Sequence, residues 1–164
     1  MVAKAGLFPH WIMNDGVFEK TFHVGWANVD LNGHLRNTSY IDLAVDVRLF
    51  YFEENGFPVT AFHKYGFGPV IMSDEIRYYR EVRLLEEIRV NLRLAGLSSD
   101  VSRFKLRQEI FRSDGVLAAA LTSVGGWLSF ETRKLTLPPP KVAEIWAGLP
   151  RTDDFEELPS SIKK

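Results

Sequence analysis

The strongest hydrophobic pattern in the chain runs from Tyr40 to Phe52. Only Asp42, Asp46 and Arg48 are charged in this stretch, so a helix here carries apolar side chains around nearly its whole circumference. Such a helix is wrapped by other elements rather than laid on a surface. The pattern therefore predicts one long buried helix at the centre of the fold.

The ends of this helix carry their own signals. Asn37, Thr38 and Ser39 are possible N-cap residues, and Ser39 followed three residues later by Asp42 resembles a capping box. Asn55-Gly56 marks the end of the helix, because glycine readily takes the left-handed conformation found there.

Several other segments alternate between apolar and polar residues, which is typical of half-buried antiparallel strands. The predicted strands span residues 17–24, 70–80, 88–94, 104–111 and 116–130. Asp114-Gly115 supplies a tight hairpin turn, and Gly125-Gly126 indicates a bend or bulge. One long helix with about five antiparallel strands gives an α+β fold.

The remaining segments connect or flank these elements. Residues 57–68 are rich in aromatic side chains, which either cover the end of the helix or close over a bound group. Three prolines at 138–140 end the sheet, a short helix is expected at 141–147, and the polar stretch 151–164 is expected to be a loose tail. We expect a lead-in at 1–16, one domain at 17–140 and a C-terminal extension at 141–164.

Composition narrows the possible functions. A formal net charge of −1 gives no bulk attraction to nucleic acid or anionic lipid, and there is no basic arm for DNA. The absence of cysteine excludes thiol catalysis, disulfides and cysteine-ligated metals. His10, His23 and His63 have no metal-ligand spacing with one another, so no metal is expected. Residues 1–10 lack the apolar core of a signal peptide, and no uncharged run is long enough to span a bilayer. We expect a cytoplasmic protein.

The candidate chemistry lies just before the long helix. Asp30 falls in a glycine-containing turn a few residues ahead of the helix start, where unpaired backbone N–H groups create positive potential. A carboxylate beside an oxyanion-binding site combines a possible nucleophile or base with donors for an oxyanion. The sequence does not choose between nucleophile and base.

The ordered set Asp30-x-x-Gly33-His34-x-x-Asn37-x-x-Tyr40, with Arg48 eight residues further on, resembles the hotdog-fold acyl-CoA thioesterases of the 4-hydroxybenzoyl-CoA thioesterase type. The similarity continues through residues 75–90, Ser102-Arg103-Phe104 and residues 132–138, covering roughly residues 18 to 140. It implies a hotdog fold, in which an antiparallel sheet of about five strands wraps around one long central helix. It also implies a dimer with active sites at its interface.

The resemblance assigns roles to residues by position. Asp30 attacks the thioester carbonyl or activates water, and the backbone N–H of Asn37 binds the oxyanion. His34 either polarises the carbonyl or acts as a base, or else orders the turn through hydrogen bonds, and we favour the ordering role. The remaining substrate-binding candidates are Gly33, Tyr40, Ser102 and Arg103.

The substrate and the partner leave alternatives open. An acyl-CoA and an acyl carrier protein share the pantetheine arm. Arg103, Lys105 and Arg107 alternate along one strand face, where they either bind phosphates or form a solvated face balanced by Glu86, Glu87 and Glu109. No cofactor is expected beyond the coenzyme A of the substrate. The protein is expected to be a homodimer or homotetramer.

Two other functions fit the same fold. R-specific enoyl-CoA hydratases carry an Asp-x-Asn-Pro-x-His pattern, whereas this chain has Asp30-Leu-Asn-Gly-His34, which is one residue shorter and lacks the proline. The shorter spacing displaces the histidine from the aspartate, so hydrolysis ranks above hydration. The third candidate is an acyl-CoA-binding dimer without catalytic activity.

Overall fold

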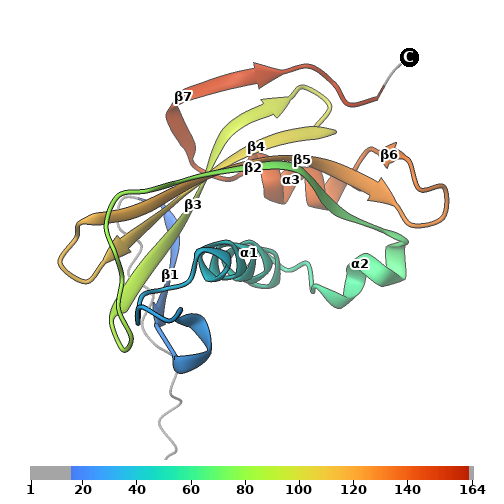
Figure 1. The fold of residues 1–164 in the computed structure, drawn as a ribbon. Coiled ribbons are helices and arrows are strands. Elements are labelled where there is room, and N and C mark those ends of the chain that lie inside the picture. The colour runs from blue at the N-terminus through green and yellow to red at the C-terminus, as the bar shows by residue number, and fades with distance from the viewer. Residues whose placement is uncertain (1–15, 163–164) are drawn as a thin grey trace, which may run out of the picture.

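A computed structural model describes residues 16–162 (Figure 1). The helices are the 3₁₀ turn η1 (Trp26–Asn28), α1 (Asn37–Glu54), α2 (Thr60–Tyr65) and α3 (Pro140–Ala147). The strands are β1 (Phe18–His23), β2 (Phe67–Tyr78), β3 (Glu87–Ser98), β4 (Arg103–Arg112), β5 (Leu117–Ser129), β6 (Leu135–Thr136) and β7 (Arg151–Leu158). The predicted lead-in at 1–16 lies outside the described residues except for its last position. None of the described helices is long and apolar enough to cross a bilayer.

The strands form one sheet in the order β1-β3-β4-β5-β2, and every pair on this path is antiparallel. This confirms the α+β class and the antiparallel sheet packed around a long helix. The sheet has seven strands rather than about five, because β6 adds two residues beside β5 and β7 pairs in parallel with β3.

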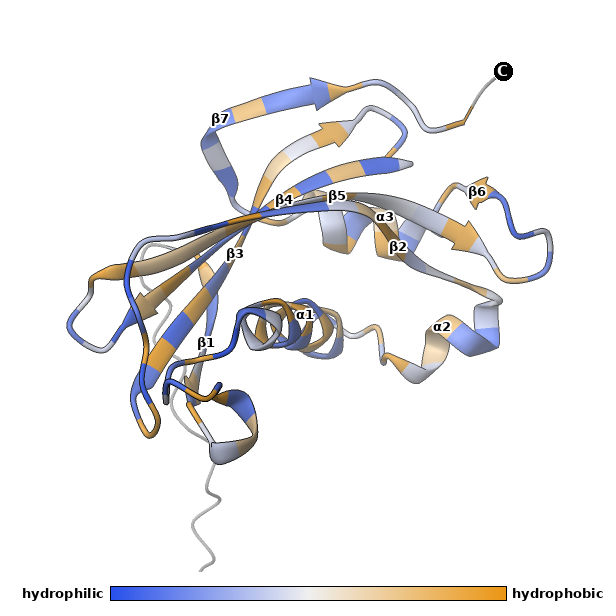
Figure 2. Cartoon of the chain, viewed as in Figure 1, coloured by the Kyte–Doolittle hydropathy of each residue, from blue (hydrophilic) through white to orange (hydrophobic). Residues whose placement is uncertain are grey.

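Alternation along the strands separates the two faces of the sheet, as the bands along β3 show in Figure 2. In β4 every even position from Phe104 to Ile110 is buried, while every odd position is partly exposed. The buried side chains face α1 and α3 and form most of the core.

One side of α1 packs against the sheet, whereas the other side is partly exposed in a single chain. Ala44 and Val47 are fully buried against the strands, whereas Val45 is 37% exposed and Phe50 is 44% exposed. Apolar side chains do surround α1, but a single chain covers only part of this apolar surface.

The helix also begins earlier than a Ser39 cap requires. The N-cap residue is Arg36, whose side chain makes no capping hydrogen bond, and Ser39 already lies inside the first turn. The Ser39 hydroxyl is fully buried and has no hydrogen-bond partner among the described residues. The predicted capping box with Asp42 is therefore wrong.

Aromatic side chains close the far end of α1. The ring of Phe52 stacks on Trp146 of α3 at 4.8 Å between centroids, and Trp146 packs edge-on against the buried Trp127. The predicted helix at 141–147 is present as α3. In the aromatic connection, Phe57 and Phe62 pack on Phe52, so this segment covers the helix end.

The paired glycines of β5 permit close packing of neighbouring strands. A Cβ atom on Gly125 would lie 2.5 Å from the carbonyl oxygen of Val70 and 2.7 Å from the Phe104 ring. The irregularity predicted here lies on the partner strand, where the register of β2 shifts between Ile71 and Ser73 opposite Gly125.

The C-terminal segment is not a loose tail, because residues 151–158 form β7. Its acids pair with the basic outer face of β4: Lys105 Nζ lies 2.6 Å from Glu156, and Arg107 Nη2 lies 3.0 Å from Asp154. Figure 1 shows β7 on the opposite side of the sheet from α1. The three glutamates expected to balance these cations contact other groups instead: His23, Asn91 and Arg112.

The turn between β3 and β4 ties down the end of the described chain. Asp100 Oδ1 accepts hydrogen bonds from the hydroxyls of Ser98 and Ser102, both at 2.7 Å, and Oδ2 accepts one from Ser160 at 2.5 Å. These hydrogen bonds outweigh the desolvation that would raise the pKa of Asp100, and they hold that pKa well below its usual value.

Asp100 should therefore make the stability of the protein depend on pH in the acid range. A carboxyl whose folded pKa is depressed stabilises the fold above its unfolded pKa, near 3.8, and loses that contribution as pH falls towards the folded pKa. We expect Asp100→Asn to lower the melting temperature at pH 7. The difference from the native protein should shrink as pH falls below about 4. A difference that stayed constant from pH 7 to pH 2.5 would contradict the role of this carboxylate.

Candidate active site

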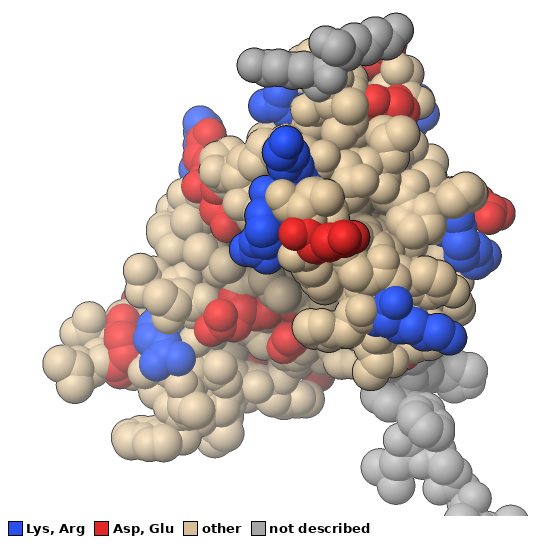
Figure 3. All heavy atoms as spheres, turned by 90° about the vertical axis from the view of Figure 1, so that its right-hand side faces the viewer, with Lys and Arg blue, Asp and Glu red and all other residues tan. Residues whose placement is uncertain are grey.

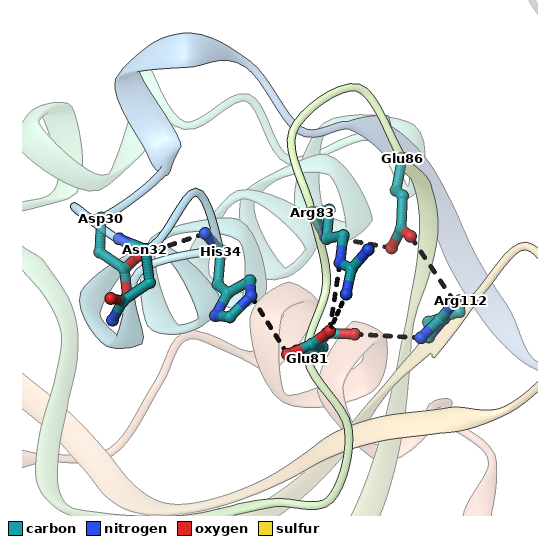
Figure 4. Close-up of polar contacts among 7 residues, drawn as sticks. All are labelled: Asp30, Asn32, His34, Glu81, Arg83, Glu86 and Arg112. Carbon is teal, nitrogen blue, oxygen red and sulfur yellow. Dashed lines mark hydrogen bonds and ion pairs between the residues drawn. The ribbon is translucent and has the colours of Figure 1, made fainter.

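The turn that carries Asp30 is closed by its own carboxylate. Asp30 Oδ1 accepts hydrogen bonds from the backbone N–H of Asn32 at 2.8 Å and of His34 at 3.1 Å (Figure 4). Gly33 adopts a φ of +72°, which glycine takes without steric cost. No hydrogen bond from the described residues reaches Oδ2, so this oxygen is available to a substrate.

The first turn of α1 lies beside the Asp30 turn. Asn37 and Thr38 are exposed, and the amides at a helix start lack the partners that an earlier turn would supply. With no capping side chain at Arg36, the positive end of the helix dipole is open. This arrangement is suited to an oxyanion.

Tyr40 forms the inner wall next to that helix start. Its side chain is only 3% exposed, and its ring packs edge-on against Tyr78 of β2 at 5.2 Å between centroids. Burial raises the pKa of Tyr40 to about 12, with smaller contributions from Tyr78, Glu86 and Asp30. Tyr40 therefore stays protonated at neutral pH and can serve only as a neutral hydrogen-bonding group.

These residues line one groove of about 400 Å³. The turn and α1 contribute one side of the groove, and the end of β2 with the residues that follow it contributes the other. The lining residues are Asp30, His34, Leu35, Asn37, Tyr40, Tyr78, Tyr79, Arg80 and Glu81. The structure thus gathers four of the residues singled out in the sequence: Asp30, His34, Asn37 and Tyr40.

The connection between β2 and β3 is hydrogen-bonded to the Asp30 turn. The N–H of Leu35 donates to the carbonyl of Val82 at 2.7 Å, and the N–H of Leu84 donates to the carbonyl of Gly33 at 3.3 Å. On the groove side, His34 Nε2 lies 3.1 Å from Glu81 Oε2.

Glu81 is in turn held by its neighbour. Arg83 donates to Glu81 Oε1 from Nη2 at 2.5 Å and from Nε at 3.1 Å. The hydrogen bond from Arg83, followed by the charge of His34, holds the pKa of Glu81 below its usual value. The carboxylate is therefore ionised over the whole neutral range.

The other predicted site residues lie elsewhere. Gly33 is part of the turn but does not line the groove, and neither do Ser102 and Arg103. Ser102 is fully buried at the start of β4, where it belongs to the Asp100 cluster. Within a single chain these two residues are not brought to Asp30.

Sequence reasoning missed Tyr78, Arg80 and Glu81 as groove residues. The segment was correctly assigned as the end of one strand and a turn, but its contact with His34 spans more than forty residues of sequence. No local pattern reports such a contact. No three His, Cys, Asp or Glu side chains within residues 16–162 are grouped so that they could hold a metal ion.

A second polar cluster lies beneath α1, away from the groove. Arg48, which is 7% exposed, donates from Nε to Gln108 Oε1 at 2.7 Å and from Nη2 to Ser123 Oγ at 2.6 Å. Ser123 donates to Asp74, and Gln108 donates to the carbonyl of Ala44 at 2.9 Å. Burial lowers the pKa of Arg48 to about 10, partly offset by Asp74, so the guanidinium is still charged at neutral pH.

Comparison with solved structures identifies the fold. A 1,4-dihydroxy-2-naphthoyl-CoA thioesterase from Synechocystis, Slr0204, superposes with a TM-score of 0.73 at 16% identity, covering 82% of this chain and 98% of its own. A DHNA-CoA thioesterase from Staphylococcus aureus gives 0.73 at 19% identity, with 80% and 89% coverage. The protein SAV2348 from Staphylococcus aureus, solved in complex with CoA, gives 0.72 at 19% identity, with 83% and 87% coverage. These likenesses confirm the hotdog fold.

Sequence comparison gives a family as well. No curated protein sequence matches the chain. A family model described as the Thioesterase-like superfamily matches residues 24–145, which include the Asp30 turn, α1 and the strands β2 to β6. Because this match covers well over half of the sequence, the chain belongs to the Thioesterase-like superfamily.

Proposed function

We propose that this protein hydrolyses an acyl-CoA thioester to a carboxylic acid and free thiol. The observation that carries the proposal is the groove in which the free Oδ2 of Asp30 lies beside the uncapped start of α1. The family membership supports thioester chemistry, and two of the solved structures with the same fold are named as CoA thioesterases.

In the proposed reaction the thioester carbonyl oxygen lies at the N–H of Asn37. Negative charge that develops on this oxygen is stabilised by that N–H and by the helix dipole. Asp30 either attacks the carbonyl carbon from Oδ2 or removes a proton from an attacking water. The C–S bond then breaks, and the thiolate leaves and takes up a proton. Where Asp30 has attacked, water then hydrolyses the resulting anhydride, which releases the carboxylic acid and restores the Asp30 carboxylate. Tyr40 lines the site around the acyl group, and Gly33 allows the backbone of the Asp30 turn to adopt its conformation.

Coenzyme A is the proposed carrier, although two of the three cations along β4 that could bind its phosphates are already paired. Lys105 and Arg107 are paired with β7, and Arg103 lies on the same strand without an ion pair among the described residues. Figure 3 shows positive and negative side chains interspersed on the face nearest α2 and β6. A carrier protein sharing the pantetheine arm is the competing substrate.

The test is thiol release from short, medium, long and aryl acyl-CoAs, and from the matching acyl carrier proteins. We expect turnover on at least one acyl-CoA. Release only from carrier proteins would reassign the carrier. Conversion of crotonyl-CoA to hydroxybutyryl-CoA without free thiol would replace hydrolysis by hydration. Tight acyl-CoA binding without turnover across the panel would indicate a binding protein.

We also propose that two copies pair through β2. This strand has twelve residues at the edge of the sheet, with Met72 43% exposed and Tyr78 49% exposed, and its last residue lines the groove. A second copy on this edge would cover unpaired strand N–H and C=O groups, bring its own residues to the groove and cover exposed side chains of α1 such as Val45.

We therefore expect a mass of about twice 18.7 kDa, or a multiple of that, by light scattering. Thiol release per chain should fall on dilution as the copies separate. A monomer that retained full activity at the same concentration would contradict the pairing.

A further inference from the structure

Glu81 and His34 form a carboxylate–imidazole pair at the wall of the groove (Figure 4). The two oxygens of Glu81 have separate partners: Oε2 lies 3.1 Å from His34 Nε2, while Oε1 accepts both hydrogen bonds from Arg83. The carboxylate is thus fixed in place and cannot rotate away without losing one of them.

This contact decides which ring nitrogen carries the proton. A carboxylate accepts but does not donate, so neutral His34 holds its proton on Nε2 and leaves a lone pair on Nδ1. Figure 4 shows the second ring nitrogen on the side of the ring away from Glu81. A partner that fixes the tautomer and orientation of an imidazole prepares it to accept a proton.

The backbone holds the two residues in register. His34 forms an isolated bridge with Arg83, two residues beyond Glu81, and the N–H groups of Leu35 and Leu84 donate across the same junction. The N–H of His34 also donates to Asp30 Oδ1. The imidazole and the Asp30 carboxylate therefore belong to one turn and keep a fixed relation.

We propose that Glu81 is a positioning residue that holds His34 as the proton acceptor for the hydrolytic water. The proposal rests on the proposed thioesterase function and assigns one role to each residue: Asp30 is the nucleophile, and His34 is the base. Asp30 first attacks the carbonyl carbon from Oδ2, and the thiolate leaves. Water oxygen forms a bond to the carbonyl carbon of the resulting anhydride, and its proton passes to His34 Nδ1. The bond to Asp30 breaks, the acid departs, and the imidazolium returns its proton to the solvent or to the thiolate.

Other charged and titratable groups surround the ring on each side. Asp30 belongs to the same turn and Tyr40 comes from α1, while the end of β2 and the connection beyond it supply Tyr78, Tyr79, Arg80, Glu81 and Arg83. Glu81 is the one carboxylate among them with an ion-pair contact to the imidazole.

The test compares His34→Gln, Glu81→Ala and the double variant. Loss of the base should reduce kcat by about 100-fold in His34→Gln. Loss of the partner that orients the base should reduce kcat by about tenfold in Glu81→Ala, with KM within twofold of the native value. The double variant should match His34→Gln, because Glu81 acts only through His34.

The matched control is Glu86→Ala, which removes the same charge from the same connection. Glu86 contacts the N–H of Arg83 and the side chain of Arg112 but not His34. It should leave kcat unchanged. Equal losses in Glu81→Ala and Glu86→Ala, or multiplicative losses in the double variant, would overturn the proposal.

A second measurement does not depend on activity. At pH 8, ¹⁵N shifts of the His34 ring should report the Nε2–H tautomer in the native protein and in Glu86→Ala, and a mixture of tautomers in Glu81→Ala. An unchanged tautomer in Glu81→Ala would overturn the proposal even if thiol release is found. A native protein that fixes the tautomer but releases no thiol would instead defeat the thioesterase function, and the water-activating role with it.

Discussion

Replacing Asp30 by Asn should reduce thiol release by about 10³-fold or more with little loss of stability. The amide oxygen of Asn can still accept the N–H groups of Asn32 and His34, so the turn is expected to keep its shape. What is lost is the negative charge of the oxygen that attacks the carbonyl or accepts a proton. Steady-state kinetics on the best acyl-CoA, with a melting curve of each protein, measures both effects.

Asp42→Asn is the matched control for this substitution. It removes a carboxylate from the exposed side of α1, away from the residues that line the groove. We expect the native rate from it. Native turnover in Asp30→Asn would show that Asp30 has no part in the chemistry, whatever the substrate.

Replacing Arg48 by Met should destabilise the protein by about 3 kcal/mol or more, because the acceptors on Gln108 and Ser123 remain buried without their donor. Gln108 and Ser123 are both fully buried, so water does not reach them in the native fold. Urea unfolding, with the two slopes compared, gives the loss in the free energy of unfolding.

Arg77→Met serves as the control for that measurement. Arg77 forms a surface ion pair with Glu75, at 2.9 Å, with most of its side chain exposed. Such pairs contribute about 0–1 kcal/mol. If the two arginine variants were equally stable, the buried cluster would not be holding α1 to the sheet.

The strands of the sheet could be predicted from the sequence, because buried and exposed positions alternate along them. The period-two pattern of residues 104–111 predicts β4, and the structure extends this strand by only one residue at each end. The exception within that pattern, Gln108 on the buried face, was the visible sign of the cluster around Arg48. A polar residue at a core position indicates a partner without saying which one.

The last strand, β7, could not be predicted in this way. Within β7 only Thr152 is buried, and Phe155 and Leu158 are half-buried, so there is no alternation to detect. The strand is held by ion pairs to Lys105 and Arg107, and ion pairs between distant segments leave no periodic signal. The same reason explains why these two cations were assigned to other partners.

The residues of the candidate site could be predicted only where they are close together in the sequence. Asp30, His34, Asn37 and Tyr40 lie within eleven positions, and a turn followed by a helix brings them to one groove. Glu81 reaches the groove from another element, through a connection folded back on the turn. The roles of all these residues remain predictions until the variants are measured.

The acidic strand β7 also affects how copies of this chain associate. One edge of the sheet is the long β2, whereas the other is shared by the six residues of β1 and by β7. Asp154 and Glu156 are paired with β4, but Asp153 and Glu157 have no ion pair among the described residues, and these like charges resist pairing of β7 with another copy. If copies pair at β2 but repel one another at β7, the sheets cannot continue from copy to copy into a filament. We therefore expect the protein to stay dispersed at high concentration.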